Sequence, residues 1–71
     1  METTLMLAKM TDEELDRECA TLTALVLMGI SSRRDTTLLD ACLCECRKRG
    51  KEEIFHEAQE RVFSHLYPWA L

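Results

Sequence analysis

Four cysteines are the most chemically versatile side chains of this chain, and three of them stand at alternate positions, 42, 44 and 46. If this segment is helical, Cys42 and Cys46 share one face and Cys44 points nearly opposite. Three such thiolates cannot converge on one zinc ion, which takes its ligands in a tetrahedron. We therefore interpret Cys19, Cys42 and Cys46 as small buried apolar residues and Cys44 as an exposed thiol. A metal or redox role is the less favoured interpretation.

The histidines do not complete a catalytic motif. His56 and Glu57 begin like the H-E-x-x-H motif of zinc proteases, but position 60 is glutamate rather than histidine. No Ser/His/Asp or Cys/His arrangement is indicated, and two glycines are too few for a Gly-rich phosphate loop. We therefore expect no catalytic residue, no metal and no cofactor, and predict that the protein is not an enzyme.

A basic cluster follows the cysteines, and two further arginines follow the turn Gly29-Ile30-Ser31. The favoured interpretation of the cluster is a charge match with the acidic start of the first helix. The turn, however, is similar to that of a helix-turn-helix, in which the arginines would begin the recognition helix. Such a motif also needs a third helix, and the net charge of −4 weighs against DNA binding. A small DNA-binding regulator is the alternative function, using the Gly29–Arg34 turn and the basic side chains Arg33, Arg34, Arg47, Lys48, Arg49 and Lys51.

The length of 71 residues allows one small domain and no deep catalytic cleft. Apolar residues make up 46% and charged residues 31%, which is typical of a folded chain rather than a disordered one. The net charge of −4 disfavours nonspecific binding to nucleic acid or to anionic membranes. No run of about 18 apolar residues is present, and no basic signal region. We therefore expect no membrane partner and a reducing cytoplasm, where the cysteines stay thiols.

The first helix is predicted over 12–29, after an N-terminal segment, 1–10, that has no clear period. Thr11 and Glu14 form a capping box, and acidic residues crowd the first turn, where the helix dipole favours them. Apolar residues then recur at spacings of three and four. Gly29 suits a left-handed cap at the C-terminal end of this helix.

The second helix is predicted to be long, over 33–66, with Ser31 or Ser32 as its N-terminal cap. Gly50 could end it, but no capping residue follows and the apolar period continues through position 50. An interior glycine costs only about 1 kcal/mol relative to alanine. We therefore predict one helix with at most a kink at Gly50, followed by an apolar tail, 67–71. The expected fold is all-α: an antiparallel hairpin of two unequal helices in a single domain, 1–71.

The unequal lengths predict a homodimer. The second helix would project beyond the first, and its apolar stripe would have no cover within the chain. A second copy of the chain would cover this stripe and complete a helical bundle. The predicted dimer interface consists of Ile54, Phe55, Ala58, Val62 and Leu66.

The favoured function is a non-enzymatic protein-interaction module that binds an unidentified protein partner. Acidic residues and an aromatic tail would form its binding surface, because tyrosine and tryptophan are frequent interface anchors. The candidates are Glu13, Asp16, Glu52, Glu53, Glu60, Tyr67 and Trp69.

The layout also resembles the very small early-region proteins of lambdoid bacteriophages. The residues that suggest it are Met10–Leu15, the Gly29–Ser32 turn and the long charged arm to Leu66. The resemblance implies a helical hairpin that dimerises in the host cytoplasm. It also implies a role in lytic development through binding of a host or phage protein. No catalytic residue is implied.

Overall fold

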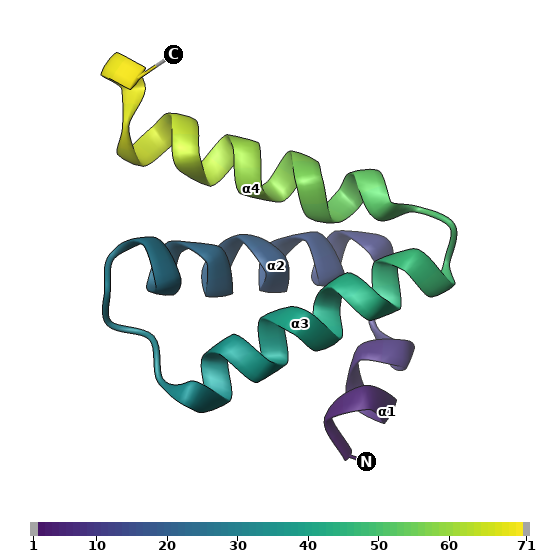
Figure 1. The fold of residues 1–71 in the computed structure, drawn as a ribbon. Helices are drawn as coiled ribbons and strands as arrows, with labels where there is room; N and C mark the ends of the chain where they lie inside the picture. Colours follow the sequence, from purple (N-terminus) through teal and green to yellow (C-terminus); the bar gives the residue numbers. More distant parts are fainter. Residues whose placement is uncertain (1, 71) are drawn as a thin grey trace.

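The computed structural model describes residues 2–70, and the side chains of residues 6–69 (Figure 1). Its elements are α1 (Glu2–Lys9), α2 (Asp12–Leu27), α3 (Arg33–Lys48), α4 (Glu52–Leu66) and the short 3-10 helix η1 (Pro68–Ala70). The prediction of an all-α fold is confirmed for these residues. Met1 and Leu71, the outer ends of the predicted N-terminal segment and tail, lie outside the described residues.

Helix α2 lies between α3 and α4 and packs against both, while α1 packs against α3 (Figure 1). Helix α3 runs back along α2, whereas α4 runs in the same direction as α2. The contacts Asp16–Arg61 and Leu27–Tyr67 fix this direction. The last turns of α2 and α4 and the first turn of α3 therefore lie at one end of the molecule, on the left in Figure 1. We call this the open end and define it as residues 24–34 and 61–69.

Local signals place both ends of α2 close to their predicted positions. The Glu14 amide donates to the Thr11 hydroxyl oxygen at 3.1 Å, and the Thr11 amide donates to the Glu14 carboxylate at 2.9 Å, so the capping box is confirmed. Gly29 has φ +74° and follows the helix as its left-handed cap. The amide of Ile30 donates back to the Leu25 carbonyl at 3.1 Å. The helix ends at Leu27, two residues before the predicted limit.

The prediction of one continuous helix over 33–66 is wrong, because α3 ends at Lys48 and α4 begins at Glu52. Gly50 has φ +67°, and the Lys51 amide donates to the Cys46 carbonyl at 2.9 Å. This is the same cap that Gly29 forms after α2. Lys51 supplies no side-chain cap to α4, so the start of α4 has no local capping signal. The break lets α4 turn back and bury Phe55 and Ala58 within the chain, which a continuous helix cannot do.

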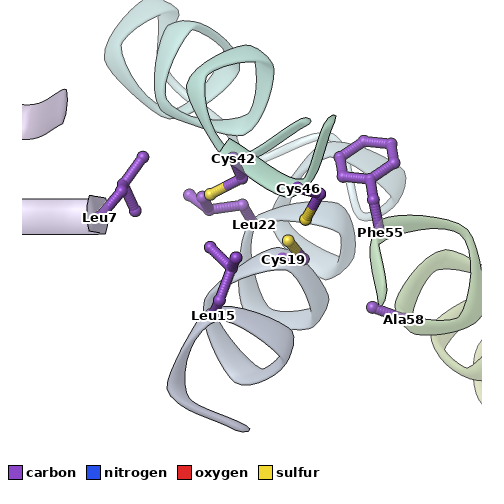
Figure 2. Packing of buried hydrophobic residues seen from close by; sticks show 8 residues of the cluster. All are labelled: Leu7, Leu15, Cys19, Leu22, Cys42, Cys46, Phe55 and Ala58. Atoms are coloured by element: carbon purple, nitrogen blue, oxygen red, sulfur yellow. The ribbon is translucent and has the colours of Figure 1, made fainter. Parts of the chain in front are cut away.

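The core joins all four α-helices. Cys19, Cys42 and Cys46 sit between α2 and α3, as predicted (Figure 2). Cys44 is exposed. Phe55 and Ala58 reach this core from α4, and Leu7 reaches it from α1. The buried apolar residues are Leu7, Leu15, Cys19, Leu22, Cys42, Cys46, Phe55 and Ala58.

The predicted dimer stripe therefore belongs largely to the chain's own interior. Phe55 and Ala58 are 6% and 0% exposed, and Ile54, Val62 and Leu66 are half-buried. The premise of the homodimer, an arm projecting without cover, is wrong because α4 packs along α2. The homodimer itself stays a prediction, without this interface to support it.

The core occupies only one half of the molecule. Helix α3 has no buried residue before Cys42, and α4 has none after Ala58 among the described side chains. In α2 the last buried residue is Thr23. The half that contains α1, the start of α2 and the end of α3 is closed. The open end has no buried side chain among those described.

Candidate interaction surface

The open end exposes a group of large apolar side chains, which we call the apolar patch. Ile30 is 63% exposed, Met28 58% and Trp69 78%, although all three are large and apolar. Among the other large apolar side chains described, Met6 is 46% exposed and lies in α1, away from this end. The apolar patch consists of Val26, Met28, Ile30, Phe63 and Trp69.

Aromatic contacts join the side chains on the α4 side of the apolar patch, and one hydrogen bond connects this side with the end of α2. The ring centroids of Phe63 and Tyr67 lie 5.2 Å apart, and those of Tyr67 and Trp69 lie 5.8 Å apart, edge to face. The Tyr67 hydroxyl is 3.4 Å from the Leu27 carbonyl oxygen, a long hydrogen bond that ties the tail to the end of α2. Of the two predicted tail anchors, Tyr67 is thus half-buried and holds the tail, while Trp69 faces solvent.

Charge within the open end is basic, while the acidic residues Asp35 and Glu60 adjoin it. No aspartate or glutamate lies between Glu18 and Asp35, and none follows Glu60. Arg33 and Arg34 are exposed in the first turn of α3, and neither pairs with a carboxylate within the described residues. Arg61 is the third cation, and its guanidinium bonds the Asp16 carboxylate at 2.8 Å. The apolar patch is therefore flanked by two unpaired arginines.

Only some of the predicted acidic residues lie close together. Glu13 and Asp16 meet Glu57, which sequence reasoning missed, along a groove of about 280 Å³ between α2 and α4. Glu60 lines a second hollow on α4, which adjoins the first because both are lined by Glu57 and Arg61. No contact of Glu53 assigns it to either hollow.

The carboxylate of Glu52, another acidic candidate, already forms ion pairs within the chain. Its carboxylate contacts His56 Nε2 at 2.8 Å and Arg47 Nε at 2.9 Å. These two partners lower the pKa of Glu52. Of the acidic candidates, Glu52 and Asp16 are thus in internal ion pairs. The spacing of acidic residues along the sequence does not indicate which carboxylates are paired.

The basic cluster serves mainly to hold the fold. Arg49 Nε donates to Glu45 at 2.7 Å, and Nη1 donates to Asp12 at 2.8 Å. Its Nη2 donates to the carbonyl oxygens of Leu7 and Met10 at 2.9 and 2.7 Å. Asp12 also accepts from Lys51, and both bonds lower the pKa of Asp12. The predicted charge match with the start of the first helix is therefore present at Asp12.

The nucleic-acid candidates lie at the two ends of α3. Arg33 and Arg34 begin this 16-residue helix and Lys48 ends it, a separation of about 24 Å at 1.5 Å per residue. Arg47, Arg49 and Lys51 are already paired with carboxylates. The structure thus does not gather the six residues into one basic surface.

The buried thiols have low reactivity. The hydrogen bond with Cys42 and burial raise the pKa of Cys19, and burial raises the pKa of Cys46 to about 12. A thiol, unlike a thiolate, is a poor nucleophile and metal ligand. Within the described residues, no three His, Cys, Asp or Glu side chains are placed to hold a metal ion.

None of the described helices has the length and apolar character needed to cross a bilayer. Comparisons with protein-family models, with curated proteins and with solved structures found no significant match to this chain. The resemblance to early-region phage proteins therefore stays a prediction. The long second helix on which its layout partly depended is two helices here.

Proposed function

We propose that this protein is a non-enzymatic interaction module and that the apolar patch is its binding surface. The observation behind this proposal is the concentration of exposed large apolar side chains at one end of a chain whose core lies at the other. Large apolar side chains that gather on one exposed part of a small domain mark interaction sites. The accessible surface of 5066 Å² also exceeds the roughly 4,500 Å² typical of a compact monomer of this mass.

The residue types in the apolar patch support a protein partner. Its tryptophan and methionine belong to the residue types enriched at interfaces, and Trp69 stands out from the surface on a short, fixed tail. If the phage resemblance holds, the partner is a host or phage protein in the host cytoplasm. The acidic α2–α4 groove remains a secondary candidate surface, because Asp16 within it is already paired with Arg61.

Photo-crosslinking in the cells that make the protein tests the proposal. p-Benzoylphenylalanine replaces Met28 in one variant and Arg17, an exposed residue of α2 outside the open end, in a matched control. We expect the Met28 variant to form a discrete adduct with a different protein and the Arg17 variant to form none. Adding Ile30→Ser and Trp69→Ser should abolish that adduct without changing helicity, since both side chains are exposed. Adducts at both positions alike, or at neither, would count against the proposal.

DNA binding is the second candidate, and one observation favours it. The break at Gly50 supplies the third helix that a helix-turn-helix needs, and Arg33 and Arg34 are exposed at the start of α3. A gel-shift assay with duplex DNA at low salt discriminates between the two functions. An interaction module of net charge −4 gives no shift, whereas a DNA-binding protein gives one that the double variant Arg33→Glu/Arg34→Glu abolishes.

A further inference from the structure

Most of the acidic residues and the exposed apolar residues lie on different parts of the molecule. This distribution indicates which kind of partner the apolar patch would bind. The acidic residues of α2 and α4 lie at or before Glu18 and Glu60, and Glu60 borders the apolar patch in a hollow that it shares with Phe63. The open end combines the apolar patch with Arg33 and Arg34, which have no carboxylate partner among the described residues. A partner that covers the apolar patch gains most if it brings acidic groups to these two guanidinium groups.

We propose that the occupant of the apolar patch is an acidic amphipathic helix of a partner protein, an inference that rests on the proposed function. Its apolar side chains would cover Met28, Ile30 and Trp69, and its rim carboxylates would pair with Arg33 and Arg34. A helix suits this surface because the described residues include no strand edge to which an extended peptide could add. Affinity must then come from side chains, which is how amphipathic helices bind.

A second copy of the chain fits the apolar patch less well. A twofold contact places the same surface of each copy against the other. Arg33 and Arg34 of both copies would then approach one another, and the one acidic residue of that helical turn, Asp35, already accepts a hydrogen bond from the Ser32 amide. Like charges facing each other in this way disfavour association.

A membrane surface or a nucleic acid also fits less well. Recognition of anionic lipid typically uses clusters of about 4–8 Lys or Arg, and duplex DNA binding often neutralises about 6–10 phosphates. The open end offers two unpaired arginines and a third that Asp16 neutralises. The net charge of −4 opposes both polyanionic surfaces.

Trp69 provides a direct readout of binding, because it is the chain's single tryptophan and is 78% exposed. The probe is a synthetic helical peptide of about 18 residues, without tryptophan, that has leucine at i, i+3, i+4 and i+7 and glutamate elsewhere. Two matched peptides keep the leucines and replace every glutamate with glutamine or with lysine. Each is titrated into the full chain at low and at high salt.

We expect the glutamate peptide to shift the Trp69 emission and to bind about tenfold or more tightly than the glutamine peptide at low salt. Arg33→Glu/Arg34→Glu should remove that preference. The matched reversal Arg17→Glu/Lys48→Glu changes two exposed cations outside the open end and should alter the Kd less than about twofold. High salt should reduce the preference between peptides, because exposed charges are screened.

The outcomes separate the inference from the proposed function. Equal binding of the three peptides, lost on Ile30→Ser/Trp69→Ser, overturns the acidic partner and leaves the apolar patch as a binding surface. No Trp69 response to any peptide overturns the inference, and the Met28 crosslinking result then decides the proposed function separately. Binding to vesicles of phosphatidylglycerol or to duplex DNA in place of the peptide, or a concentration-dependent dimer that blocks it, also overturns the inference.

Discussion

Arg49 is the residue on which most of the closed half depends. Its guanidinium is 18% exposed and bonds the carboxylates of Glu45 and Asp12 and the carbonyl oxygens of Leu7 and Met10. It thereby holds α1 and the α1–α2 turn against the end of α3. The sequence predicts that the basic cluster pairs with the acidic start of the first helix. It does not distinguish Arg49 from the basic residues beside it.

Replacing Arg49 with methionine should lower the free energy of unfolding by about 3 kcal/mol, measured by urea denaturation. The cost arises because Glu45, whose side chain is 8% exposed and whose Oε1 has no partner among the described atoms, would lose its only counter-charge. The double variant Arg49→Met/Glu45→Met should recover part of that loss, since no unpaired charge remains. Lys48→Met, at an exposed neighbour, should change the free energy by less than about 0.5 kcal/mol. A loss at Arg49 no larger than at Lys48 would contradict this role.

The four cysteines should differ sharply in reactivity. Brief treatment of the native chain with iodoacetamide should give one adduct, at exposed Cys44, by mass spectrometry. Cys19, Cys42 and Cys46 should react only after unfolding, because they are fully buried and the pKa of Cys46 is raised to about 12. Cys44→Ser removes the native adduct and serves as the control. Two or more rapid adducts on the native chain would show that the packing between α2 and α3 opens.

At the scale of elements, the two glycine caps show that one helix end is determined by local sequence and another by distant packing. Gly29 and Gly50 adopt nearly the same left-handed backbone, with φ +74° and +67°. The first was predicted, because Ser31 and Ser32 mark a new helix after it. The second was not, because Lys51 has no capping side chain and the apolar period runs on. Packing of α4 along α2 decides the break, and that contact is remote in sequence.

Substitution of Gly50 tests this explanation through chirality. L-alanine should lower the free energy of unfolding by about 1 kcal/mol, because a left-handed backbone disfavours an L side chain. D-alanine, introduced by chemical synthesis, should not lower it, because a positive φ is the favoured backbone of a D residue. No atom lies within 4 Å of the Cβ that L-alanine adds, so the cost of L-alanine comes from the backbone conformation alone. L-alanine and D-alanine at Gly29 should differ in thermal melts in the same way as they do at Gly50. Equal effects of the two enantiomers would mean that the positive φ is not maintained in solution.

At the scale of the whole molecule, ion pairs link α2 to α4 and to the turn between α3 and α4. Asp12 of α2 joins Arg49 and Lys51, and Asp16 joins Arg61 of α4. The pKa of Asp12 is held below its ordinary 3.8, mainly by its bond with Lys51. The pKa of Glu52 is held below 4.5, first by His56 and then by Arg47. Both carboxylates are exposed, so each interaction is screened.

The thermal stability should therefore fall in acid. A carboxyl group whose pKa is lowered on folding stabilises the native state above its unfolded pKa, and this contribution disappears as the pH falls through the folded value. We expect Tm, followed by circular dichroism, to change little between about pH 7 and 5 and to drop below about pH 4. Asp12→Asn/Glu52→Gln should lower Tm at neutral pH and flatten the acid drop. A steep loss between pH 7 and 5 would contradict the assignment of the pH dependence to these two carboxylates.

Much of the local structure could be predicted from the residues alone. The capping box at Thr11, the left-handed cap at Gly29 and the inward face of the cysteines each depend on neighbours within a few positions. Such signals act within one turn of helix, so the composition of that turn is enough to reveal them.

The tertiary structure alone decided which apolar surface is covered. Phe55 and Ala58, expected to face a second chain, face α2, while Met28, Ile30 and Trp69 remain exposed at the other end. The same distant contacts took Arg49 and Lys51 from the basic cluster into ion pairs. A helical period shows that a stripe must be buried but not against what, because the competing partners differ only in long-range packing.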